Sequence, residues 1–152
     1  MDYREKRLAR HLLAAMAYRT ALALENAPEG YPGFDAGGGV PTPLRALQHM
    51  TAVARFMTSL LGGPAPTPAT ADRLEGAIDE FYRAVRDADQ RLKDAEGVGA
   101  DVLLRVAQGP LSDLTHHAGQ LCLLRRLAGS PVRKVRFPSA PIRAGKFPPE
   151  LA

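Results

Sequence analysis

Three side chains in this sequence have types and spacing that suit a divalent metal ion. Asp113 and His117 are four positions apart in an apolar run, so on a helix they project from one face. His49 lies in an earlier apolar run, on a different predicted helix. Two imidazoles and one carboxylate form a recurring ligand set for divalent metals that leaves coordination positions open. These residues therefore define a candidate metal site.

Each of the three residues also has an ordinary structural interpretation. Pro110 is expected to begin the helix that carries Asp113, and a carboxylate in a first helical turn is stabilised by free backbone N–H groups and by the helix dipole. Asp113 could therefore be a plain capping acid. His49 and His117 have apolar neighbours along the sequence, so each could be a hydrogen-bonded core histidine. The residue types alone leave these alternatives open.

The remaining histidines and the single cysteine are expected to have no catalytic role. His116 points about 100° away from its neighbour His117 on a helix, which favours a surface or interface position. His11 has no spaced partner and is interpreted as structural. Cys122 lies among leucines and cannot form an internal disulfide, so an inert thiol in a reducing, cytoplasmic protein is expected.

Composition favours one globular domain without a membrane span. The chain has 152 residues, of which 45% are hydrophobic and 24% charged. No apolar run approaches the roughly 20 residues that a spanning helix needs, and the first residues contain no apolar signal core. The net charge is +4. Five basic residues against one acid lie beyond residue 129, which leaves the preceding region neutral, so nucleic acid is not an expected partner.

Hydrophobic periodicity predicts four long helices and no strand. Thr42 and Pro43 are a typical helix start, and the pair Gly129 and Pro131 is a typical helix stop. The predicted long helices cover residues 2–26, 42–61, 69–95 and 110–128, with a short helical turn at 100–108.

These elements predict an all-α, four-helix bundle over residues 1–129. Residues 130–152 contain several prolines and are predicted to form an extended basic tail. The tail is expected either to pack on the bundle, through Val135, Phe137, Ile142 and Phe147, or to trail from it. Sequence alone does not order the helices, so the metal site requires that the helices of His49 and Asp113 begin at the same end of the bundle.

The spacing of these residues resembles the DinB/YfiT-like superfamily of metal-dependent enzymes. That family carries Ser or Thr followed seven positions later by His, and a later His-x-x-x-His-Arg-Gly-Gln segment before an apolar run, Gly and Pro. The similarity extends over roughly residues 4–131. The matching residues here are Thr42, His49, His117, Gly119, Gln120, Gly129 and Pro131.

The resemblance implies a three-ligand metal site, with two departures. The family's first histidine of the second segment is Asp113 here, and its arginine is Ala118. A carboxylate oxygen can replace an imidazole nitrogen as a ligand, at the cost of one unit of positive charge around the ion. The expected metal is zinc or nickel, with iron or manganese as alternatives. Gln120 is expected to support the site by orienting a ligand.

Two functions follow as expectations. By resemblance, the protein is a divalent-metal-dependent enzyme that activates a low-molecular-weight thiol, such as bacillithiol or mycothiol, or a water, for attack on a small-molecule substrate. This would make it a thiol-dependent S-transferase or a hydrolase, and the family implies a homodimer. The alternative is a non-catalytic, stress-associated binding or dimerisation module that has lost its metal, as the departures at Asp113 and Ala118 would allow.

Overall fold

The computed structural model describes residues 1–152 and is all-helical, which confirms the predicted all-α class. No helix in it is long and apolar enough to cross a membrane. The elements are α1 (Tyr3–Leu24), α2 (Pro43–Leu60), α3 (Leu74–Asp94), α4 (Ala100–Val106), the π-helical segment η1 (Ala107–Leu111), α5 (Ser112–Leu127) and the short 3-10 turn η2 (Phe137–Ser139).

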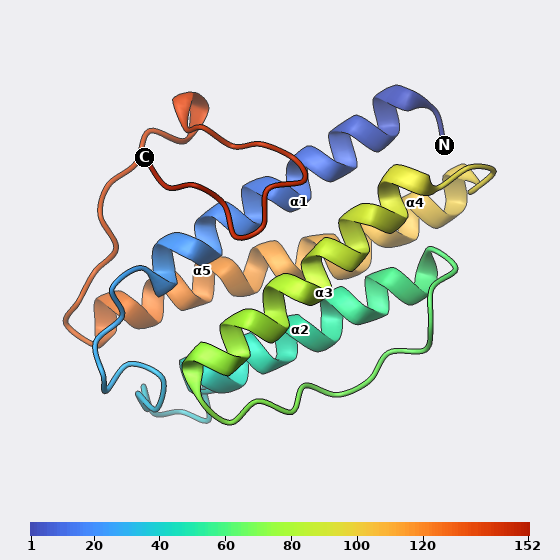
Figure 1. The fold of residues 1–152 in the computed structure, drawn as a ribbon. Helices are drawn as coiled ribbons and strands as arrows, with labels where there is room; N and C mark the ends of the chain where they lie inside the picture. The colour runs from blue at the N-terminus through green and yellow to red at the C-terminus, as the bar shows by residue number, and fades with distance from the viewer.

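The long helices pack lengthwise in two pairs, α1 with α5 and α2 with α3 (Figure 1). α2 and α3 run in one direction, whereas α1 and α5 run in the other. The linker between α2 and α3 therefore returns along the outside of the molecule. One hydrophobic core of 25 buried residues joins all four helices; Leu13, Leu47, Phe81 and Leu121 are fully buried in it.

The predicted start of α2 is confirmed, whereas the predicted start of α3 is too early. The Thr42 hydroxyl accepts a hydrogen bond from the Arg45 N–H at 3.3 Å, and Pro43 is the first helical residue. α3 was expected from residue 69 but begins at Leu74. The backbone N–H groups of Thr70 and Ala71 instead donate to the buried Glu80 carboxylate, which holds this segment outside the helix.

The prediction that a new helix begins at Pro110 is wrong. α4, η1 and α5 follow one another without a break, so a single helix runs from Ala100 to Leu127 with Pro110 inside it. Proline lacks an N–H, and its ring clashes with the carbonyl four residues earlier in an α-helix. The wider π-helical turn of η1 accommodates the ring, which is a known way for a helix to retain an internal proline.

Residues 130–152 turn back over α1 and α3 (Figure 1). Phe147 enters the hydrophobic core and is 7% exposed. Its carbonyl accepts a hydrogen bond from Arg86 of α3 at 2.8 Å. The Phe137 ring meets Tyr18 edge-on, with the Arg19 guanidinium 3.7 Å from the ring centre. These contacts tie the segment to the helices.

Candidate metal centre

The three candidate metal ligands lie between helices that run in opposite directions. His49 of α2 faces Asp113 and His117, whereas Phe56, further along α2, faces the earlier residue Gln108. The two helices are therefore antiparallel. The condition that both helices begin at the same end is therefore wrong. The residues still meet, because the partner helix begins well before Pro110 and places Asp113 and His117 in its middle, beside the second turn of α2.

The three candidate ligands converge in space. Their donor atoms all lie within 4.8 Å of one another. The Nε2 atom of His49 is 3.2 Å from Oδ2 of Asp113, and Nε2 of His117 is 3.3 Å from Oδ1 of the same carboxylate. The two imidazole rings meet edge to face with their centres 4.6 Å apart. The carboxylate is thus shared between two imidazoles, one at each oxygen.

This spacing fits a metal ion. Zinc bonds of about 2.1 Å in a tetrahedral arrangement place neighbouring donor atoms about 3.4 Å apart. The two His–Asp separations of 3.2 and 3.3 Å are close to that value; they involve different oxygens of Asp113 and are also hydrogen-bond distances, and all the donor atoms lie within 4.8 Å. Two neutral imidazoles and one carboxylate would leave a divalent ion with one net positive charge. Three protein ligands would also leave at least one coordination position for water or substrate.

The structure excludes two of the structural interpretations, a core position for His49 and a capping role for Asp113. The His49 side chain is 52% exposed, so it is not a core histidine. Asp113 lies in the interior of a continuous helix and accepts no capping hydrogen bond, so it is not a capping acid either. His117 is the most enclosed of the three, with 17% of its side chain exposed. The site therefore has one sheltered and two accessible ligands.

Gln120 contacts the sheltered ligand. Its Oε1 atom lies 2.7 Å from Nδ1 of His117, and its Nε2 atom lies 3.0 Å from Nε2 of His116. If His117 donates its Nδ1–H to the Gln120 oxygen, the Nε2 lone pair is free and faces the Asp113 carboxylate. Metal-bound histidines commonly donate their other ring N–H in this way. Gln120 therefore contacts a candidate ligand, and its supporting role stays a prediction.

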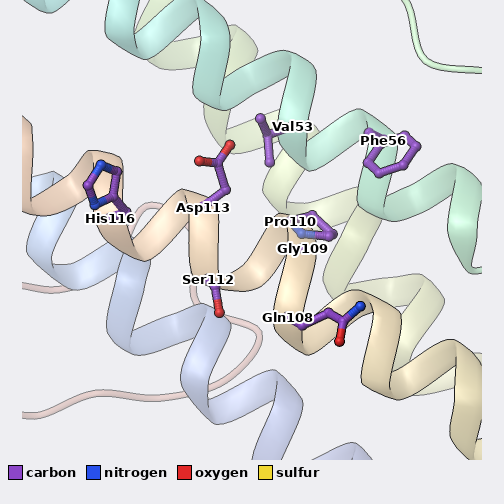
Figure 2. Close-up of a pocket in the computed structure, with 8 residues that line it drawn as sticks. All are labelled: Val53, Phe56, Gln108, Gly109, Pro110, Ser112, Asp113 and His116. Atoms are coloured by element: carbon purple, nitrogen blue, oxygen red, sulfur yellow. The ribbon is translucent and has the colours of Figure 1, made fainter.

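A hollow of about 500 Å³ opens beside Asp113 (Figure 2). Val53 and Phe56 of α2 form one wall of it, and Gln108, Gly109 and Pro110 of η1 form another. The Asp113 carboxylate is directed toward α2 at the edge of this space. Sequence reasoning missed these lining residues, because Gly109 and Pro110 read as a helix start and not as a π-helical turn next to a site.

Three residues close to His117 in the sequence are Ala118, Gly119 and Cys122. A Cβ added at Gly119 would meet nothing within 4 Å, so no neighbouring element approaches this glycine closely. Ala118, where the family has Arg, is fully buried in the core. Burial raises the pKa of the Cys122 thiol, against a smaller opposing effect of Arg19 and Arg125, so it remains protonated and unreactive at neutral pH.

The chain matches no protein-family profile, no curated protein and no solved structure. The resemblance to the DinB/YfiT-like superfamily thus rests on the motif residues quoted above, and the geometry of the site is argued from this chain alone.

Proposed function

We propose that this protein is a divalent-metal-dependent enzyme with the four-helix bundle of the DinB-like family. The observation that carries the proposal is the convergence of His49, Asp113 and His117, with all donor atoms within 4.8 Å. Zinc or nickel suits two imidazoles and one carboxylate, and iron or manganese suits them as well. A cytoplasmic location and a homodimer belong to the same proposal.

The protein groups would hold the metal and shape the space beside it. His49, Asp113 and His117 supply the ligands, and Gln120 fixes the ring of His117 by accepting its Nδ1–H. When bound, the metal would lower the pKa of a coordinated thiol or water and so supply the nucleophile at neutral pH.

The hollow beside Asp113 supports a small-molecule substrate. Val53, Phe56 and Pro110 offer apolar surface, and Gln108 offers an amide that can hydrogen-bond a polar substituent. The hollow would hold an electrophilic small molecule beside the metal that His49, Asp113 and His117 would bind, and the metal would supply an activated low-molecular-weight thiol as the nucleophile. Metal-assisted hydrolysis, with water in place of the thiol, is the second chemistry that this arrangement supports.

Metal content tests the proposal. The protein is purified without an affinity tag or metal resin, and its metals are quantified per chain after dialysis. Near-stoichiometric zinc, nickel, iron or manganese is expected, with loss of most of it in His49→Ala and His117→Ala. His11→Ala and His116→Ala serve as matched controls and should retain it. A chain that stays metal-free after addition of zinc and nickel would contradict the proposal.

A non-catalytic dimerisation module is the second candidate function. Exposed leucines on two neighbouring helices favour it, namely Leu8 and Leu12 on α1 together with Leu123 and Leu127 on α5. If this is the function, Leu8→Gln with Leu123→Gln abolishes a dimer in sedimentation experiments, and chelators change neither the fold nor the dimer.

A further inference from the structure

Unpaired cations gather on the first two turns of α1, away from the candidate metal centre. Arg4, Lys6 and Arg7 on α1, and Lys93 near the end of α3, take part in none of the ion pairs of the molecule. Arg10, the next cation on α1, makes a two-pronged pair with Asp89. In the tail, Arg133 and Lys146 pair with Glu25 and Glu150, and its other three cations are unpaired as well, so what sets the α1 cations apart is their grouping.

Helix stability does not explain these cations. The N-terminus of a helix carries a partial positive charge, so basic side chains there are disfavoured. The Asp2–Glu5 capping box already satisfies that end of α1. Three basic residues in this position therefore oppose the dipole, and an anionic ligand would offset the repulsion.

Lys6, Arg7 and Lys93 line a hollow of about 310 Å³ between α1, α3 and the tail. No acidic residue lines this hollow. The negative charges that act on Arg10 are those of its partner Asp89 and, more weakly, Asp94. The lining residues are Tyr3, Lys6, Arg7, Arg10, Lys93 and Ala144. A concave surface with three unpaired basic side chains, Lys6, Arg7 and Lys93, suits phosphate groups, which Arg and Lys bind through charge-assisted hydrogen bonds.

A second hollow adjoins the first one. It has a volume of about 500 Å³ and shares Tyr3 and Arg7 with the first, adding Arg4, Leu8 and His11. Tyr3 is 75% exposed and Leu8 is 61% exposed, so an aromatic face and an apolar side chain stand free beside the cations. Aromatic side chains in such positions stack on flat heterocycles.

We infer that this face of α1 binds a small ligand that carries two or more phosphates and a flat ring, of the nucleoside di- or triphosphate class. The phosphates lie in the hollow of Lys6, Arg7 and Lys93, and the ring lies against Tyr3 and Leu8. This inference is independent of the proposed metal chemistry, because no residue is shared between the two sites.

Calorimetric titration of the full chain with ATP, in low salt with excess EDTA, tests the inference. Saturable binding is expected, and it should weaken as salt is added because exposed charges are screened. The double variant Lys6→Gln with Arg7→Gln should weaken ATP binding by about tenfold or more, since two charge-assisted contacts are lost. Arg126→Gln with Lys134→Gln makes the same charge change at exposed positions elsewhere and should bind ATP as the wild type does.

Parallel arms identify what is bound. Inorganic tripolyphosphate should bind more weakly than ATP, and Tyr3→Ala should remove that difference. His49→Ala with His117→Ala should leave ATP binding unchanged. No ATP binding would overturn the inference, as would equal loss in both charge variants. Binding confined to a single-stranded oligonucleotide or to phosphatidylserine vesicles would overturn it too, and would assign the cations to a macromolecular surface.

Discussion

Gln120 determines which nitrogen of His117 can reach the candidate metal. The Gln120 amide touches His117 with its oxygen and His116 with its nitrogen. If His117 donates its Nδ1–H to this oxygen, its Nε2 atom is free to coordinate. With the amide reversed, the proton would move to Nε2 and would be donated to Asp113 instead. A single side-chain amide thus distinguishes a ligand from an ordinary hydrogen-bonded histidine.

Gln120→Leu is expected to weaken zinc binding by about 10- to 100-fold, the range seen when a supporting partner of a metal ligand is removed. The measurement is competition for zinc with a chromophoric chelator. His11→Ala is the matched control, because His11 lies on α1 and contacts neither Gln120 nor the candidate ligands; its affinity should stay near that of the wild type. Equal affinities in the wild type and Gln120→Leu would show that Gln120 has no positioning role.

At the scale of the helices, the sequence correctly predicted those helix ends that are set by residues at the end itself. Thr42 and Pro43 form a start, and Gly129 with φ of +80° forms a stop, because these residues act on their own backbone neighbours. The errors arose where tertiary contacts decide. Glu80 draws the backbone of Thr70 and Ala71 away from the start of α3, and the π-helical turn allows Pro110 inside a helix.

Glu80 fastens the linker between α2 and α3. Burial pushes the pKa of Glu80 upward, but hydrogen bonds from the Ala71 N–H, the Arg55 guanidinium and the Thr70 N–H outweigh it and lower the pKa from 4.5 to about 2. A carboxylate with a lowered folded-state pKa stabilises the fold fully above its unfolded value. The stabilisation is lost as the pH falls from about 4.5 toward 2.

Glu80→Gln should lower the free energy of unfolding at neutral pH by on the order of 3 kcal/mol, which follows from the size of the pKa difference. It should also flatten the decline of stability between pH 4.5 and pH 2. Urea unfolding at several pH values measures both effects. Glu75→Gln, an exposed position on the same helix, is the control. An unchanged acid profile in Glu80→Gln would contradict the role assigned to this carboxylate.

At the scale of the whole molecule, hydrophobic periodicity could not predict that the three candidate ligands lie close together. Periodicity placed His49, Asp113 and His117 on two helices, but it says nothing about the order or direction of those helices. The family resemblance grouped the three positions as one site. The accompanying requirement, that the helices of His49 and Asp113 begin at the same end of the bundle, was wrong. The hollow next to the site depends on η1, and the cationic face depends on how α3 and the tail meet α1.

The segment beyond residue 129 contributes to the core of the molecule, so its loss should destabilise the fold. Phe147→Ala is expected to lower the free energy of unfolding by about 3–5 kcal/mol, as for other buried phenylalanines. Truncation after Ser130 should act in the same direction. Leu127→Ala, at a side chain that is 56% exposed, is the control. Urea midpoints measure the effects, and unchanged midpoints for Phe147→Ala and the truncation would mean that the segment is only a trailing arm.

X-ray absorption at the zinc edge is the most direct measurement of the ligand set. The protein is loaded with one equivalent of zinc and compared with His49→Ala, Asp113→Asn and His117→Ala. A first shell of two imidazoles and further oxygen ligands at about 2.0–2.2 Å is expected, with one imidazole lost in each histidine variant. A zinc spectrum without imidazole scattering, or one unchanged in all three variants, would contradict the metal centre.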